Sequence, residues 1–289
     1  MPSKSHNIHL YQKRSVSESI ETTFDFMRIN RSVWFRTALT ILLPPSILAS
    51  LVLLFLGHED SGIFYVWSEF FDHGAEVYVP ITYFGLWAVY IHVYSLLIAY
   101  ISHGDNADTL KIRQMVPFIK EVAWRALLMP VVPVLMLYLF MSEGYGWVVA
   151  LVLSVLIVPL ALMPSLFILE RRDFYGAFGK SVTLGFSAWF HLAAVMAITM
   201  LLGFYITWSF QVPEILLGSM VDTFTLGEAG LLGILLSFVL HFVLYVLVLF
   251  GALVMLSVFI MGCALEYGSI SEDVEAVSLA NDVENFENL

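Results

Sequence analysis

Six apolar segments, each long enough to cross a lipid bilayer, constrain this chain more than any other feature. They comprise residues 33–56, 77–101, 122–141, 147–169, 189–208 and 229–265. About 20 helical residues cross a hydrocarbon core about 30 Å thick, and these segments carry almost no charge. Backbone groups in lipid must be bonded within the chain, which favours helices. We therefore expect an all-α, polytopic integral membrane protein with six transmembrane helices.

The last apolar segment, residues 229–265, is longer than one untilted crossing requires. Its middle offers only Gly251 for a turn, and a turn in lipid would leave backbone groups unbonded. We therefore predict one long helix. The alternative is a hairpin of two spans, which would make seven spans in total.

The thirteen Lys and Arg residues fall on one side of the membrane when six spans are drawn. They precede the first span, with Arg36 just inside it, lie between the second span and the start of the third, or lie between the fourth and fifth spans. By the positive-inside rule we predict an inner (cell) membrane protein with cytoplasmic N- and C-termini. The expected divisions are a cytoplasmic N-terminus at 1–32, a transmembrane domain at 33–268 and an acidic, disordered cytoplasmic tail at 269–289.

Residues 174–187, between the fourth and fifth segments, show the pattern of an amphipathic helix. Asp173 is placed to act as its N-cap. Successive helical residues turn by about 100°, so Phe174, Phe178, Val182 and Phe186 share a stripe about 120° wide. We expect this stripe to face lipid or the bundle and Lys180 and Ser187 to face water. Such a helix lies in the membrane interface, and we call it an elbow.

Two further segments repeat this construction. Ser15 and Glu18 form a capping-box pattern before the first span, and Ile112 with Val116 marks a poorer copy before the third. Each copy ends in a tryptophan followed by a cation, which suits the headgroup layer. These predicted interfacial anchors are Trp34 with Arg36, Trp124 with Arg125, and Trp189 with His191. The chain thus reads as three repeats of an elbow and a helix hairpin, although basic, amphipathic loops between spans can arise without any repeat.

The elbow FYGAFGKSVTLGFSAWF and the N-terminal stretch YQKRSVSESIETTFDFMRINRSVWF resemble one bacterial family. It is the membrane domain attached to glycerophosphoryl diester phosphodiesterases, with its stand-alone inner-membrane relatives. The resemblance covers roughly residues 15–267 and implies a six-helix membrane domain with no catalytic residues to transfer. The sequence has no segment of the length that a phosphodiesterase domain needs, so diesterase activity is not expected.

Polar side chains inside the spans are the candidates for ligand contacts. His92 and His241 lie well inside the second and sixth segments and could meet, or each could bond a neighbouring helix. The second segment carries an aromatic stripe, which is either a packing face or the wall of a ligand cavity. Its members are Tyr83, Trp87, Tyr90 and Tyr94. Prolines interrupt four segments, so we also expect a gap between spans one, three and four.

The sequence offers little for catalysis or for cofactors. Cys263 is the single cysteine, and no phosphate-binding loop or nucleophile elbow occurs. The loop residues with metal-binding side chains match no known ligand spacing, and they read as a solvated acidic loop. They are His58, Glu59, Asp60, Asp72 and His73. We expect no catalytic, cofactor-binding or metal-binding residues.

Three functions remain open at this stage. The first is a non-enzymatic protein that organises or assists membrane lipids or partner membrane proteins. The second is a transporter of a lipid or small amphiphile, which the prolines and the repeats favour. The third is a membrane enzyme, for which no catalytic constellation is evident. The expected partners are the lipid bilayer, its lipids and other membrane proteins, and nucleic acid is not among them.

Overall fold

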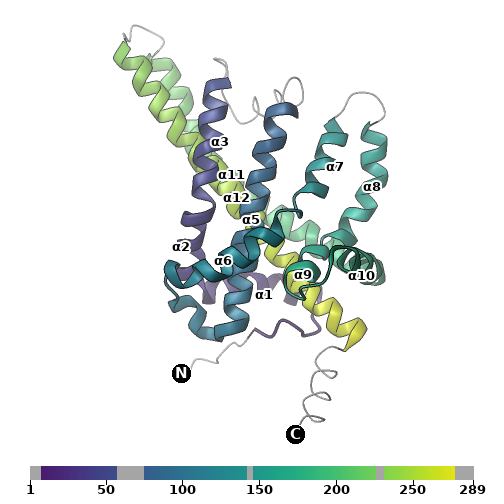
Figure 1. Cartoon of the computed structure of the whole chain (residues 1–289). Coiled ribbons are helices and arrows are strands. Elements are labelled where there is room, and N and C mark those ends of the chain that lie inside the picture. The colour runs from purple at the N-terminus through teal and green to yellow at the C-terminus, as the bar shows by residue number, and fades with distance from the viewer. Residues whose placement is uncertain (1–7, 57–74, 142–145, 226–230, 277–289) are drawn as a thin grey trace.

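The computed structural model describes residues 8–56, 75–141, 146–225 and 231–276, and every regular element within them is a helix (Figure 1). The elements in chain order are α1 (Val16–Ile29), α2 (Arg31–Ile41), α3 (Leu43–Leu56), α5 (Ala75–His103), the 3₁₀ helix η1 (Gly104–Thr109), α6 (Ile112–Ala126), α7 (Val131–Met141), α8 (Gly146–Leu160), α9 (Met163–Ile168), α10 (Phe174–Ser187), α11 (Trp189–Thr225) and α12 (Leu231–Glu275). The all-α prediction is confirmed for these ranges.

Four stretches of helix within the described ranges are long and apolar enough to cross a membrane. They are Arg31–Leu54, Val79–His103, Trp189–Leu217 and Leu235–Glu275. The pair Ile112–Ala126 and Val131–Leu139, bent by 45°, makes a fifth if it is counted as one span. The chain is therefore an apolar helical protein with several helices able to span a bilayer.

The third and fourth expected spans are not single straight helices. Residues 122–141 divide between α6 and α7, which are separated by a turn ending at Pro130. Residues 147–169 divide between α8 and α9, and the break follows Pro159. Proline lacks an amide hydrogen and its ring clashes with the preceding turn, so the helix bends or ends there.

The last apolar segment is one continuous helix from Leu231, as predicted, and no hairpin forms. It continues to Glu275, beyond the expected domain boundary at 268, and α11 continues to Thr225, beyond the expected end at 208. The two helices lie side by side and project together beyond the other helices at one end (Figure 1). The rest of the predicted tail, residues 277–289, lies outside the described residues.

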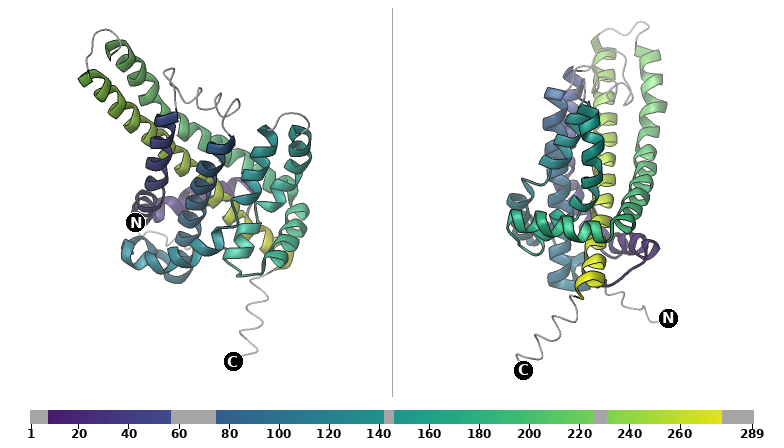
Figure 2. Two further views of the ribbon diagram at one scale, coloured as in Figure 1. Left: turned by 45° about the horizontal axis from the view of Figure 1, so that its top comes forward. Right: turned by 90° about the vertical axis from the view of Figure 1, so that its right-hand side faces the viewer.

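All three predicted elbows are helices, and they gather at one end of the bundle, which we call the elbow end (Figure 1). Two views show α1 and α10 crossing the long helices at a steep angle (Figure 2). The predicted caps are present: Ser15 and Glu18 form a reciprocal capping box, and Asp173 accepts from the amide of Gly176 at 3.1 Å. These caps start α1 and α10 at the expected residues.

Candidate functional site

His92 is fully buried and joins three helices. Its Nδ1 lies 3.1 Å from the hydroxyl of Ser257 on α12, and its Nε2 lies 3.3 Å from the carbonyl oxygen of Trp34 on α2. A carbonyl can only accept, so Nε2 must carry hydrogen. His92 thus acts as a polar connection between α2, α5 and α12.

The two membrane histidines do not meet. His92 contacts α12 at Ser257, which is sixteen residues from His241 on the same helix. That separation is about 24 Å along a continuous helix. His241 is buried and lies 2.9 Å from the carbonyl oxygen of Ser237, one turn earlier in α12.

Two members of the aromatic stripe bond the backbone where α6 ends. The amides of Leu127 and Val131 pair with Trp124 and Leu128 rather than with the residues four positions earlier. The carbonyls of Ala123 and Leu127 therefore lack their usual helical donors. Trp87 donates its indole N–H to Ala123 at 2.9 Å, and Tyr83 donates its hydroxyl to Leu127. Here two side chains of α5 donate hydrogen bonds to the carbonyls that the kink leaves without helical donors.

The other two stripe residues are buried, whereas Tyr83 and Trp87 are partly exposed. Tyr90 and Tyr94 stack with ring centroids 6.3 Å apart, and the hydroxyl of Tyr94 lies 2.9 Å from that of Ser165 on α9. The stripe as a whole thus contacts α6, which precedes the first break, and α9, which follows the second.

Replacing both Tyr83 and Trp87 by phenylalanine should destabilise the protein while keeping the stripe aromatic. Two carbonyls near the kink would then lose their donors, and a hydrogen bond between membrane helices contributes about 0.6 kcal/mol on average and up to about 1.7. Thermal unfolding in detergent should show a lower midpoint for the double variant. The exposed Tyr205→Phe provides the control. An unchanged midpoint would contradict the assignment.

Of the predicted anchor tryptophans, one is exposed at the surface and the other two contact neighbouring helices. Trp124 is 80% exposed, whereas Trp34 is buried with its ring centroid 4.7 Å from that of His92. The indole of Trp189 donates at 3.1 Å to the carbonyl of Val155, whose usual donor position is occupied by Pro159. Trp189 thus repeats, at the second break, the role of Trp87 at the first.

The cationic anchors bond to backbone carbonyls in neighbouring elements. Arg36 donates to Leu110 at 3.2 Å, and Arg125 donates to Phe167 at 2.8 Å and also lies over the ring of that residue. These bonds fix α2 against the residue that follows η1, and α6 against α9. They place both guanidinium groups within the elbow end.

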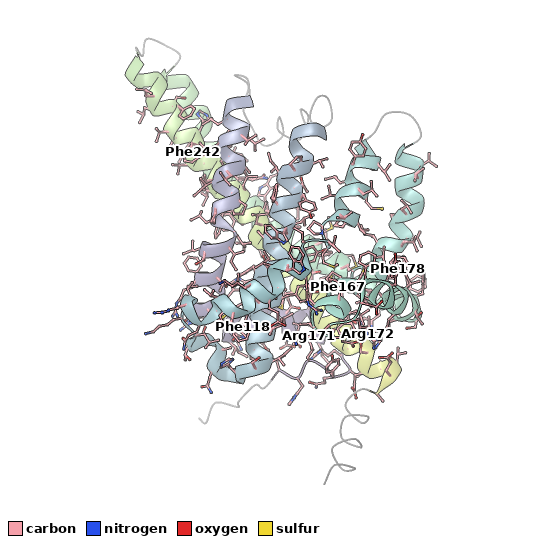
Figure 3. The ribbon with its side chains drawn as sticks, in the orientation of Figure 1. Phe118, Phe167, Arg171, Arg172, Phe178 and Phe242 are labelled. Carbon is pink, nitrogen blue, oxygen red and sulfur yellow. The ribbon has the colours of Figure 1, made fainter. Side chains whose placement is uncertain are left out.

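The phenylalanine stripe predicted for α10 lies on the outer face of that helix. Phe174, Phe178 and Phe186 are exposed, and Phe178 lies at the outside of α10 in Figure 3. The side that packs on the bundle consists mainly of small residues, and a Cβ added to Gly185 would lie 2.3 Å from the Cα of Pro159. This leaves the stripe available to lipid.

Lys180 does not face water as predicted. Its side chain is largely buried between two carboxylates, 2.6 Å from Glu275 and 3.6 Å from Glu170. The expectation was wrong because α12 extends far enough to place Glu275 beside α10. Ser187 is exposed, as expected.

A polar network surrounds the last turns of α12 at the elbow end, and the sequence reasoning missed it. Glu266 is fully buried, accepts a hydrogen bond from Ser19 on α1 at 2.5 Å, and lies 3.6 Å from His191 on α11. Arg14 is buried beside it and donates its backbone amide to Ser269 at 2.9 Å. A carboxylate set within the buried sequence CALEYGSIS was the available signal, but it fell just beyond the expected end of the span.

Glu170, in the loop after α9, is the centre of the adjacent part of the network. It accepts hydrogen bonds from Tyr267 and, at 2.5 Å, from Arg172, which lies at the α9–α10 junction in Figure 3. Burial alone would raise the pKa of this carboxyl, but the bonds from Tyr267 and Arg172, together with Lys180, outweigh it and lower the pKa. Glu170 is therefore held as a carboxylate that joins α12 to α10.

Glu170→Gln should lower the midpoint of thermal unfolding near neutral pH, and the difference from the parent protein should shrink in acid. The folded pKa lies below the unfolded value, so the stabilisation is complete above about pH 5 and is lost as the pH falls through the folded pKa. The exposed pair of Arg171 and Glu121 supplies the control, Glu121→Gln, because exposed pairs contribute little. A difference that stays constant down to acid unfolding would contradict this assignment.

Two cavities border the N-terminal segment at the elbow end. One of about 420 Å³ is mostly apolar, with Tyr11, Phe26, Leu97, Tyr100 and Leu265 among its lining residues. The other, of about 400 Å³, is lined mainly by polar side chains of residues 12–25. Neither includes His92, His241 or the prolines expected to create a gap between spans one, three and four.

Within the described ranges, no three His, Cys, Asp or Glu side chains converge as a metal site. His58, Glu59, Asp60, Asp72 and His73 lie outside those ranges. Cys263 is buried and free.

Comparison with protein families, curated proteins and solved structures finds no match to this chain.

Proposed function

We propose that this protein is an inner-membrane protein that embeds its elbows in the cytoplasmic leaflet and organises lipids or partner membrane proteins there, without enzymatic activity. The observation that carries the proposal is the exposed apolar face of two of the elbows, α6 and α10. Apolar side chains on α6 and α10 are exposed, whereas the polar groups of α10 and α12 pair within the elbow end. A helix of this kind inserts its apolar face at the boundary between headgroups and acyl chains.

The proposal includes six crossings and three repeats of an elbow and a hairpin. The three elbow helices precede α2, α7 and α11 in turn. Under this proposal α7 and α8 are the third and fourth crossings, with α6 and α9 at their elbow ends. The described chain begins and ends at the elbow end, where Lys13 pairs with Asp273, as an even number of crossings requires.

Topology can be tested by labelling introduced cysteines in intact cells. We expect Ser61→Cys to react with an impermeant maleimide from the periplasmic side, and Ser278→Cys to react only after the membrane is permeabilised. Both positions lie outside the described residues and flank the proposed crossings. The parent protein, which has no introduced cysteine, is the control and shows how much label the buried Cys263 takes up. External labelling at position 278 would contradict six crossings.

The functional proposal can be tested through the lipid that the protein retains. Protein purified in mild detergent should carry several-fold less phospholipid when Phe174, Phe178 and Phe186 are all changed to serine. The control changes Leu201, Phe204 and Trp208 to serine, because these side chains are also exposed but lie on α11 outside the elbows. Equal loss in both variants, or loss in neither, would argue against a role centred on the elbows. Lipid profiles of cells with and without each variant extend the measurement to the native membrane.

Transport of a lipid or small amphiphile remains the second candidate. The apolar cavity of about 420 Å³ at the elbow end favours it, since that space suits part of an acyl chain. Filling the cavity with Leu97→Trp should abolish lipid movement between the leaflets of proteoliposomes if this candidate is correct. Membership of the phosphodiesterase-associated membrane-domain family also remains a proposal, supported by the two motif stretches and the order of elbows and hairpins.

A further inference from the structure

Glu266 is an acidic side chain that the proposed function does not use. It is fully buried within a helix whose preceding turns are apolar, and three other segments surround it. Ser19 comes from α1, His191 from α11 and Arg14 from the N-terminal segment. An ionised carboxylate in such a place is costly unless it is paired or takes up a proton.

The hydrogen bonds leave one oxygen of Glu266 unsatisfied. Its Oε2 accepts from Ser19, whereas its Oε1 is buried without a hydrogen-bond partner in the described chain. The Nε2 of His191 faces that oxygen at 3.6 Å and is likewise buried and without a hydrogen-bond partner. A proton held between these two atoms would satisfy both of them.

Arg14 is not the hydrogen-bond partner of Oε1 of Glu266. Its guanidinium donates to the backbone carbonyls of His9, Leu10 and Leu265, so its charge acts on Glu266 without a direct bond. The buried thiol of Cys263, one turn earlier on α12, also lies near the carboxylate. His191 is therefore the one partner within ion-pair distance of Glu266 in the described chain.

His191 also gives the buried pair access to the surface. Its side chain is 33% exposed although its Nε2 is buried, and it follows the half-buried Trp189 by two residues at the elbow end. The imidazole ring thus connects the surface to Oε1 of Glu266. Either nitrogen of an imidazole ring can carry a hydrogen, so histidine suits this position.

We propose that Glu266 and His191 form a proton-binding site that locks elbow α1 against α11 and α12. With one proton held between them the pair is neutral, and Ser19 can keep its bond to the carboxylate. Loss of that proton leaves a net negative charge on the buried pair, offset only by the nearby charge of Arg14. Gain of a second proton leaves an imidazolium beside Arg14, and the protonated carboxyl accepts more weakly from Ser19. The second proton therefore weakens the contact between α1 and α12 through Ser19, whereas loss of the first leaves a buried charge that destabilises the packed state.

The site can be tested by infrared difference spectroscopy of the protein in lipid as the pH is changed. The parent protein should show the carbonyl band of a buried carboxyl that titrates, and Glu266→Gln should abolish it. The exposed Glu21→Gln should retain it. Persistence of the band in Glu266→Gln would overturn the assignment.

Two further variants keep the test valid if Glu266→Gln does not fold. His191→Asn and Ser19→Ala each remove a group that favours the carboxylate, so each should move the titration midpoint to higher pH by at least tenfold in proton concentration. Amide exchange in α1, compared between each variant and the parent at the same pH, should accelerate several-fold while α5 is unchanged. Unchanged midpoints, or unchanged exchange in α1, would overturn the proposed lock.

Discussion

Gly268→Ala is expected to detach the N-terminal segment from α12. A Cβ at this position would lie 2.1 Å from the carbonyl oxygen of Leu10 and 2.8 Å from its carbonyl carbon. These are backbone atoms, so no side-chain rotation can relieve the clash. The segment should move away and lose its bonds to Ser269 and Tyr100. Overpacking of this kind costs about 1–3 kcal/mol.

Hydrogen–deuterium exchange should report this detachment directly, with faster exchange over residues 8–14 and a lower thermal midpoint. Gly179→Ala is the matched control, because nothing lies within 4 Å of a Cβ added there. That control should be neutral or stabilising by up to about 1 kcal/mol, since alanine favours helix over glycine. Unchanged exchange in Gly268→Ala would show that the segment does not lie against α12 in solution.

Gly185→Ala should separate α10 from α8. The added Cβ would lie 2.3 Å from both the Cα and the Cβ of Pro159, a residue whose ring cannot turn away. We expect a loss of about 1–3 kcal/mol in the free energy of unfolding. The indole bond from Trp189 to Val155 should weaken with it, since Trp189 follows α10 directly.

Urea unfolding in detergent, followed by tryptophan fluorescence, measures both consequences of Gly185→Ala. Gly179→Ala lies on the same helix and should leave the midpoint unchanged or raised. Equal midpoints for the two alanine variants would mean that α10 does not pack on Pro159.

The long helices and the starts of two elbows were predictable from local sequence. Apolar runs placed the long helices, Ser15 and Asp173 set the starts of α1 and α10, and prolines marked the breaks near Pro130 and Pro159. Each of these signals acts within a few residues of the chain, through hydrogen bonds and steric limits that any tertiary structure must respect. The lengths of α11 and α12 were less predictable, because nothing local ends them where the apolar pattern weakens.

The packing faces and the buried polar pairs were decided by the tertiary structure alone. Hydrophobic periodicity separates apolar from polar faces, but in a bilayer the lipid face and the packing face are both apolar. The sequence therefore identified the phenylalanine stripe of α10 without showing that its small residues make the bundle contact. Likewise, Ser19 and Glu266 are 247 residues apart, and no sequence motif links them, so their contact could not be predicted. Only the packing of α1, α11 and α12 removes that carboxylate from water and makes it a site for a proton.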